Sequence, residues 1–231
     1  MQPELFRAYV NARPEVCFLF VDDGSTDGTM AVLEQLRAGH EDRIWAFRQE
    51  PNQGKAEAVR RGMREALVLE FPLAGFWDAD LATPLESIGS FLDLLEKRPE
   101  IEMIFGARVQ LLGREIRRLP VRHYLGRIFA TAVSNMLRLP IYDTQCGAKI
   151  FRVTPMLRQA LEDRFLTRWV FDVEMLARFL VYLRKDYRAL ARVVYEYPLE
   201  KWVDVAGSRV KPTDFFKAFR DVWRIWRTYL V

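Results

Sequence analysis

Residues 16–29, VCFLFVDDGSTDGT, begin as a short apolar run and continue as an acidic loop with two glycines. The apolar part, Val16–Val21, is typical of a buried strand that leads directly into the loop. The segment after the loop, Asp27–Leu36, has the pattern of a helix. A buried strand, a polar loop and a helix in succession are the repeating unit of α/β proteins, so this stretch predicts that fold class.

The same alternation extends in both directions along the chain. Residues 4–11 predict a helix, and later segments predict a strand at Ile44–Phe47, a helix at Ala56–Leu69, and strands at Ala74–Trp77 and Ile101–Phe105. Strands that alternate with helices of about 10–15 residues predict a mostly parallel sheet with helices on both faces.

Polar signatures follow three of the predicted strands. They are Asp22–Ser25, Asp78–Asp80 and Gly106–Arg108. Ligands of open parallel sheets bind beyond the carboxyl ends of the strands. We therefore expect these three segments to meet at one edge of the sheet and to form a binding site there.

Asp78 and Asp80 are two carboxylates separated only by Ala79, directly after an apolar strand. Such a pair can converge on one hard cation, Mg²⁺ or Mn²⁺. A metal held there would bridge the oxygens of a diphosphate and neutralise the charge that builds on a departing nucleotide. The alternative is a solvated acidic loop beside a helix cap.

The loop that contains Asp22 and Asp23 predicts a nucleoside contact. A carboxylate at a strand end can accept hydrogen bonds from a uracil or a ribose, and Gly24 allows a tight turn. The alternative is an acidic loop whose side chains cap the next helix. Capping accounts for Asp27, but it accounts less well for two adjacent acids, which repel one another without a nearby donor.

Lys55 follows the turn Asn52–Gly54 at the start of a predicted helix. A helix N-terminus attracts phosphate, and a lysine in that position opposes the helix dipole unless an anion is also present. The segment therefore favours a phosphate contact, and a surface turn is the alternative.

The composition suits one globular domain, since the 231 residues are 50% apolar and 29% charged. Two cysteines imply no disulfide framework, so a reducing compartment is expected, and no apolar run of about 18 residues predicts a membrane span. The formal charge is +4, and six arginines but one acid lie between Arg108 and Arg127. Phosphorylated substrates, membrane headgroups or nucleic acid could explain this stretch, but no nucleic-acid-binding module accompanies it.

These signatures together resemble those of the family 2 glycosyltransferases, which have the GT-A fold of nucleotide-diphospho-sugar transferases. Three later segments are similar to the dolichyl-phosphate β-glucosyltransferase branch: residues 143–151 (DTQCGAKIF), 168–174 (RWVFDVE) and 207–209 (GSR). The related dolichyl-phosphate mannose synthases share the D-A-D and G-x-R elements. The resemblance extends from about Val16 to Lys211.

The resemblance implies transfer of a hexose, glucose in this branch, from a UDP-sugar to a polyprenyl or dolichyl phosphate, with inversion at the anomeric carbon. It implies a peripheral protein on the cytoplasmic face of a membrane. The residues that would contact the donor are Asp22, Asp23, Lys55, Asp78, Ala79 and Arg209. Asp78 and Asp80 would hold the metal, Arg108 would bind a phosphate of donor or acceptor, and Gln145 would lie near the transferred sugar. The implied catalytic residues are thus Asp78, Asp80, Arg108 and Gln145.

The acceptor of such a reaction accounts for the basic stretch. A polyprenyl phosphate already carries an anionic oxygen, so it requires no strong general base. Two phosphorylated molecules bound together do require cations, because their charges repel. Besides Arg108, the candidates for the acceptor phosphate are Arg117, Arg118, Arg122 and Arg127. The alternative is a solvated basic helix face. A glycan acceptor and a catalytically impaired nucleotide-binding scaffold are the competing functions.

The carboxyl-terminal segment, Pro212–Val231, has the pattern of one amphipathic helix. Aromatic residues recur at helical spacing with basic residues between them, which suits a helix that lies among lipid headgroups. A helix packed on the domain is the alternative. We accordingly divide the chain into a catalytic domain, residues 1–211, and this helix, residues 212–231.

The amino-terminal part departs from the family. Its members normally open with a strand and a Pro-x-Tyr-Asn-Glu-type loop that contributes to nucleotide binding. This sequence shows neither ahead of residues 4–11, so we expect the sheet to lack its first strand. That absence would weaken donor binding and destabilise the sheet.

Overall fold

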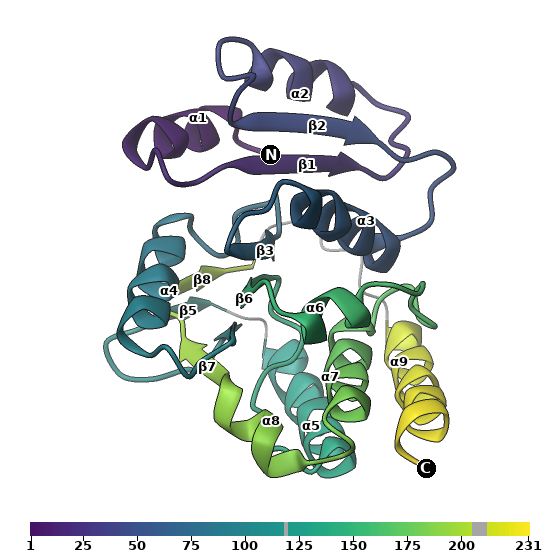
Figure 1. Ribbon diagram of the computed structural model, residues 1–231. Helices are drawn as coiled ribbons and strands as arrows, with labels where there is room; N and C mark the ends of the chain where they lie inside the picture. Colours follow the sequence, from purple (N-terminus) through teal and green to yellow (C-terminus); the bar gives the residue numbers. More distant parts are fainter. Residues whose placement is uncertain (118–119, 205–211) are drawn as a thin grey trace.

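The computed structural model describes the chain except residues 118–119 and 205–211, and the side chains of residues 120–123 and 212–214 are also left undescribed. Helices and strands alternate along it, which confirms the α/β class (Figure 1). The first half contains α1 (Pro3–Ala12), β1 (Phe18–Asp22), α2 (Thr29–Arg37), β2 (Ile44–Arg48), α3 (Lys55–Val68), β3 (Leu73–Trp77), α4 (Glu86–Lys97) and β4 (Met103–Ala107). The predicted elements of this half are present, with ends shifted by a few residues.

The second half has strands of three or five residues and helices of widely different lengths. Its elements are β5 (Glu115–Arg117), α5 (Pro120–Leu137), β6 (Ala148–Arg152), α6 (Pro155–Ala160), α7 (Phe171–Tyr182), α8 (Tyr187–Val193), β7 (Val194–Pro198), β8 (Lys201–Val203), α9 (Pro212–Ile225) and a π-helical turn (Trp226–Leu230). The carboxyl-terminal segment is helical as predicted, and α9 packs against α7 through a face that buries Val222 and Ile225. Among the described residues, no helix is both long and apolar enough to cross a membrane.

Strand pairing divides the described strands into three sheets. β1 pairs with β2 in parallel, β5 pairs with β8 in parallel, and the other strands form a sheet of order β3–β6–β4–β7. In that sheet β4 is parallel to β7, whereas β6 runs antiparallel to both of its neighbours. Three of the five ladders between the described strands are parallel, so the expected mostly parallel pairing is confirmed. The strands nevertheless form three sheets in place of one, and β6 is antiparallel because it returns from a loop and inserts between β3 and β4.

Helix α3 connects the β1–β2 sheet to the four-stranded sheet, since it contacts both β1 and β3 (Figure 1). Gly62 of α3 allows the close approach, because a Cβ there would lie 2.8 Å from Cγ2 of Val21. One buried apolar cluster joins the same two sheets, with Phe20 from β1, Ile104 from β4 and Ile150 from β6. The two sheets thus share a core, although the described β1 and β3 form no ladder with each other.

Polar segments predicted to form the binding site lie together at one edge of the four-stranded sheet. β3 and β4 run in the same direction, because both are antiparallel to β6. Their carboxyl ends, Trp77 and Ala107, therefore flank the amino end of β6 at Ala148. The Asp78–Asp80 loop, Arg108 and the loop that precedes β6 meet at this edge.

Candidate functional site

Asp78 and Lys55 form the centre of the candidate site. Asp78 follows β3, Lys55 begins α3, and Nζ of the lysine lies 2.5 Å from Oδ1 of the aspartate. Both side chains are partly exposed, 36% for Asp78 and 40% for Lys55. Burial lowers the pKa of Lys55, but the carboxylates of Asp78, Asp172 and Asp80 together outweigh this effect and raise that pKa above its ordinary value. A charged ammonium is therefore held beside an accessible carboxylate.

Asp80 lies on the exposed side of the same loop, as does Ala79. Its Oδ1 accepts a hydrogen bond from the N–H of Ala82 at 3.0 Å, which fixes the turn after β3. The described residues contain no group of three or more His, Cys, Asp or Glu side chains that could hold a metal ion. Two carboxylates still fit Mg²⁺ or Mn²⁺, since Mg²⁺ is usually bound by one or two carboxylates together with substrate phosphates and water.

The Asp23 carboxylate organises the turn that leads to Lys55. Its Oδ1 accepts hydrogen bonds from Nε2 of Gln49 at 2.6 Å and from the N–H of Gln53 at 2.9 Å. Its Oδ2 accepts one from the N–H of Gly54 at 2.8 Å, and Gly54 has a φ of +93° that favours glycine. The structure thus gives Asp23 a positioning role, and its contact with a nucleoside stays a prediction.

Asp22 is buried at the end of β1, with 3% of its surface exposed. Its Oδ1 accepts a hydrogen bond from the N–H of Ser25 at 3.0 Å, and its Oδ2 lies 3.6 Å from Nε of Arg48. The side chain therefore holds the turn after β1, and its predicted contact with the donor is left open.

The loop Asp143–Gly147 backs the Asp78 side chain. The N–H of Asp78 donates to the carbonyl of Gly147 at 2.8 Å, and a Cβ at Gly147 would overlap the Asp78 carboxylate. Glycine at this position therefore determines where Asp78 can lie. Gln145, on the same loop, is partly exposed, and its Nε2 lies 3.4 Å from Oγ1 of Thr144.

Arg108 and Asp143 form an ion pair at the end of β4. Nε and Nη2 of Arg108 donate to the two carboxylate oxygens of Asp143 at 2.6 and 2.8 Å. The guanidinium also lies over the ring of Trp202, with Cζ 5.2 Å from the ring centroid. Burial lowers the pKa of Arg108, but Asp143 more than offsets this, so the net pKa is raised. Because this geometry engages the guanidinium within the protein, it favours a role in shaping the loop, and a phosphate contact stays a prediction.

Glu196 of β7 fixes the start of the same loop. Its two carboxylate oxygens accept hydrogen bonds from the N–H groups of Tyr142 and Asp143 at 2.7 and 2.8 Å. Burial raises the pKa of Glu196, and these N–H groups lower it in part. The side chain therefore orients Asp143, which in turn holds Arg108.

Lys149 and Asp172 fix the other end of the loop. Nζ of Lys149 lies 2.5 Å from Oδ1 of Asp172 and 2.5 Å from the carbonyl oxygen of Cys146. Both ionic side chains are buried, and burial raises the pKa of Asp172 although Lys149 opposes the shift. Burial also raises the pKa of the Cys146 thiol to about 11, so this cysteine is a neutral core residue.

Gly147, Lys149 and Glu196 belong to the site without having been predicted from the sequence. The one available signal was Lys149, a lysine within the apolar strand AKIFR, because lysines are almost never fully buried unless they are paired. Nothing local distinguishes Glu196, since its partners lie more than fifty residues away along the chain.

Arg127 lies beside the loop that carries Asp143. Its Cζ lies 3.7 Å from the centroid of the Tyr142 ring, whereas Arg117 is exposed and pairs with Glu115 at 2.8 Å. Three other predicted site residues lie outside the described side chains: Arg118, Arg122 and Arg209.

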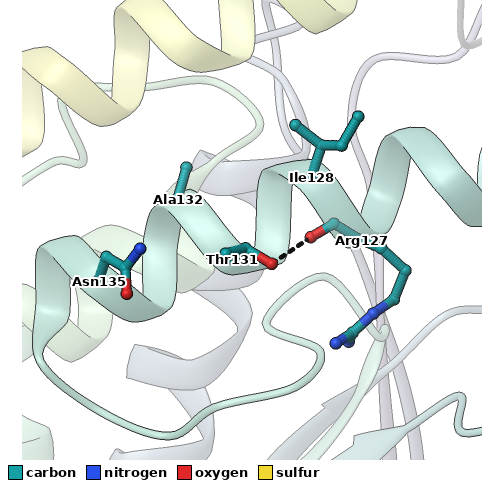
Figure 2. A pocket seen from close by; sticks show the side chains of 5 residues that line it. All are labelled: Arg127, Ile128, Thr131, Ala132 and Asn135. Carbon is teal, nitrogen blue, oxygen red and sulfur yellow. Dashed lines mark hydrogen bonds between the residues drawn. The ribbon is translucent and has the colours of Figure 1, made fainter.

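Arg127 also borders a hollow of about 410 Å³ on the outer face of α5, which Figure 2 shows. The other lining residues follow along the same helix: Ile128, Thr131, Ala132 and Asn135. Ile128 is 57% exposed, and the Thr131 hydroxyl donates to the carbonyl of Arg127 at 2.8 Å. A largely apolar surface with a cation at one end suits an amphiphilic ligand.

Known proteins include relatives of this chain. The family model described as glycosyl transferase family 2 matches residues 4–160. The dolichyl-phosphate beta-glucosyltransferase of Saccharomyces cerevisiae is 30% identical over 92% of this chain and 65% of its own length. Dolichyl-phosphate beta-glucosyltransferase ALG5C of Trichomonas vaginalis is 29% identical over 90% of this chain and 58% of its own length. The polyprenol monophosphomannose synthase of Mycolicibacterium smegmatis is 27% identical over 62% of this chain and 53% of its own length.

The chain thus spans between half and two-thirds of the length of these relatives. The matched region contains the Asp22–Ser25 and Asp78–Asp80 loops, together with Lys55 and the Asp143–Gly147 loop. The expected similarity to polyprenyl-phosphate glycosyltransferases is confirmed, and the chain belongs to glycosyl transferase family 2.

Proposed function

We propose that this chain transfers a hexose, specifically glucose, from a UDP-sugar to a polyprenyl or dolichyl phosphate. The observation that carries the proposal is the meeting of Asp78, Asp80 and Lys55 at the carboxyl end of β3, with Lys55 2.5 Å from Asp78. Two carboxylates and an ammonium offer a place for a divalent metal and for the diphosphate of a nucleotide sugar. Relatives named for dolichyl-phosphate glucosyl transfer and polyprenol monophosphomannose synthesis support the acceptor class.

The donor is proposed to bind between the β3 edge and the start of α3. Asp78 and Asp80 would hold Mg²⁺ or Mn²⁺, which supplies charge neutralisation for the departing diphosphate. Lys55 would contact phosphate oxygens from the first turn of α3. Asp23 would keep the preceding turn in place through its hydrogen bonds to Gln53 and Gly54.

The acceptor is proposed to approach along α5. Arg127 would attract its phosphate, and the apolar hollow beside Ile128 would contact the prenyl chain. The anionic phosphate oxygen would attack the anomeric carbon from the face opposite UDP, so the bond to UDP breaks with inversion and no general base is required. Exposed aromatic side chains on α9, Phe216 and Trp223, support a peripheral position on a membrane, for which we propose the cytoplasmic face.

Transfer of labelled glucose from UDP-glucose tests the proposal. In the presence of Mn²⁺ and polyprenyl phosphate, we expect the label in the lipid extract. Label in an aqueous product alone would overturn the lipid acceptor and favour a glycan acceptor. GDP-mannose, used in place of UDP-glucose under the same conditions, tests the identity of the donor.

Asp80→Ala should abolish Mn²⁺-dependent UDP binding and lower kcat/KM about 100-fold or more, because it removes a ligand for the charge-neutralising ion. Calorimetry of UDP binding and initial rates measure the two effects. Asp42→Ala is the matched control, since Asp42 is an exposed acid on the loop before β2. An Asp80→Ala variant that binds and transfers as well as the Asp42→Ala variant would contradict the proposed metal site. UDP binding without any turnover in the unmodified chain would instead favour a nucleotide-binding scaffold.

A further inference from the structure

A second hollow, of about 330 Å³, lies between the segment Leu166–Val170 and helix α9. The segment leads into α7, against which α9 packs (Figure 1). The side chains that α9 contributes include Lys217, Arg220, Asp221 and Arg224. The α5 hollow shares no lining residue with it, whereas Arg168 also contacts the turn before Lys55, where its Nη2 donates to Oδ1 of Asn52 at 2.9 Å.

Cations dominate the described walls of this hollow. Arg168, Lys217, Arg220 and Arg224 line it together with a single acid, Asp221. Arg220 lies 3.6 Å from Asp221, and Arg224 donates to the carbonyl of Leu166 at 3.3 Å. Because each guanidinium has five N–H donors, these contacts leave donors that a ligand oxygen could use. This excess of positive charge favours an anionic ligand. The paired N–H donors of an arginine guanidinium suit a phosphate in particular.

Thr167 is a further polar residue in the same wall. The residue is 4% exposed, and its hydroxyl has no hydrogen-bond partner among the described residues. Buried polar groups nearly always have a partner. The unpaired hydroxyl therefore marks a polar position behind this wall.

The wall is fixed before any ligand arrives. Both carboxylate oxygens of Glu174 accept the N–H of Leu166, at 3.0 and 2.8 Å. Arg178 donates to the carbonyls of Asp163 and Arg164 at 2.7 and 2.6 Å. A preformed wall lowers the entropy cost of binding, since fewer side chains must be ordered.

Exposed aromatic side chains border the cations. Trp169 lines the hollow and is 39% exposed, and Phe216 and Trp223 on α9 are 79% and 54% exposed. Phe216 and Trp223 are seven residues apart and share one face of α9, while Lys217 and Arg224 share the next face. Aromatic rings beside cations match the boundary between lipid headgroups and acyl chains.

We propose that the hollow between Leu166–Val170 and α9 binds the phosphate of an anionic phospholipid headgroup, with the aromatic side chains of α9 inserted beside it. The proposal rests on the proposed membrane position, but not on glycosyl transfer. The site would hold the protein at the bilayer by one headgroup while the Asp78 site remains separate.

Vesicle flotation of the full chain tests the proposal. Vesicles of phosphatidylcholine alone are compared with vesicles that contain equal amounts of phosphatidylcholine and phosphatidic acid. We expect binding to the mixed vesicles, reduced about tenfold or more in Arg220→Gln/Arg224→Gln. Arg188→Gln/Arg192→Gln, on exposed positions of α8, makes the same change in charge and should bind as the unmodified chain does. Equal losses in both double variants, or no binding of the unmodified chain, would overturn the proposal.

Two further variants separate a headgroup site from a general electrostatic attraction. Arg220→Lys/Arg224→Lys keeps the charge but removes both forks, so binding should fall; unchanged binding would contradict the site. Asp221→Asn removes the acid from the described lining of the hollow and should strengthen binding, whereas weaker binding would count against the proposal.

A binding experiment with a soluble ligand distinguishes a lipid headgroup from a free phosphate ester. Calorimetry with glycerol phosphate should show weak binding at most. A different result would overturn the lipid assignment: glycerol phosphate binds tightly, Arg220→Gln/Arg224→Gln abolishes that binding, and the same variant still binds vesicles normally. The hollow would then be a site for a soluble phosphate ester. Failure of the proposed function is seen separately, because Asp80→Ala should lose transfer and still bind the mixed vesicles.

Discussion

At the scale of single residues, Gly147 determines the position of the Asp78 carboxylate, which the sequence predicts to be a metal ligand. Gly147→Ala should lower kcat/KM about 100-fold, because a Cβ would overlap Asp78 and small displacements of reacting groups have effects of this size. Initial rates with UDP-glucose, after a thermal melt that shows intact folding, measure the change.

Gly28→Ala is the matched control for Gly147→Ala. A Cβ at Gly28 meets nothing within 4 Å, and its φ of −73° is accessible to alanine. Equal rates in the two variants would show that the placement of Asp78 by Gly147 does not matter for transfer.

Glu196 should make stability depend on pH. Its pKa lies above its ordinary value of 4.5 because burial outweighs the N–H groups of Tyr142 and Asp143 and the charge of Arg127. A folded-state pKa above the unfolded one gives a contribution that is fully present below pH 4.5 and is lost as the pH rises through the folded pKa. Urea unfolding from about pH 4 to about pH 8 should therefore show the unmodified chain losing stability relative to Glu196→Gln as the pH rises. If the stability of the unmodified chain relative to Glu196→Gln stayed constant or increased as the pH rose, the raised pKa of Glu196 would be contradicted.

At the scale of elements, the Lys149–Asp172 pair ties β6 to α7 behind the site. Lys149→Met should lower the free energy of unfolding by about 3–5 kcal/mol, because it leaves a buried carboxylate without its partner. Urea denaturation measures this loss.

The double variant Lys149→Met/Asp172→Leu is the control for this pair. It should recover most of the stability, since apolar side chains can replace a buried ion pair without large loss. Arg98, which forms an exposed ion pair with Glu100, offers a comparison: Arg98→Met should cost less than about 1 kcal/mol. A cost for Lys149→Met as small as that for Arg98→Met would show that the buried pair does not hold β6 to α7.

At the scale of the whole molecule, the core has two parts of unequal burial. β1 and β2 consist mostly of half-buried residues, whereas β4 is buried throughout and β6 nearly so. A sheet of two strands has little stability of its own and depends on what packs against it. Here that support comes from α3 and from the shared apolar cluster around Phe20.

Hydrogen exchange should reveal this inequality. We expect amides of residues 18–22 and 44–48 to exchange faster than those of residues 103–107 and 148–152, because local opening requires less free energy in the two-stranded sheet. Mass spectrometry of peptides from these segments measures the rates, with α7 as a protected reference. Equal protection across all four segments would show that the two sheets open only together.

The local pattern of the chain determined which segments are strands and helices in its first half. Apolar runs such as Val16–Val21 and the helical periodicity of Ala56–Leu69 depend on neighbours along the chain, so their interpretation required no tertiary information. The same holds for the position of Asp78, Asp80 and Lys55 at strand and helix ends. The order of strands and helices also predicted that three signatures meet at one sheet edge. Asp78–Asp80 and Gly106–Arg108 do so on the four-stranded sheet, whereas Asp22–Ser25 follows β1 of the separate two-stranded sheet.

Only the tertiary structure decided how the strands pair and what surrounds the predicted side chains. β6 lies between β3 and β4, far from both in sequence, because burial of its apolar residues and pairing of its backbone are satisfied there. Asp23 and Arg108 were predicted to face ligands, yet their hydrogen bonds connect them to Gly54 and Asp143. Such partners lie thirty or more residues away along the chain, so the local sequence pattern cannot predict them. The sequence therefore determined which chemical groups stand at the strand ends, and the folded chain determined which of them hold the site in place.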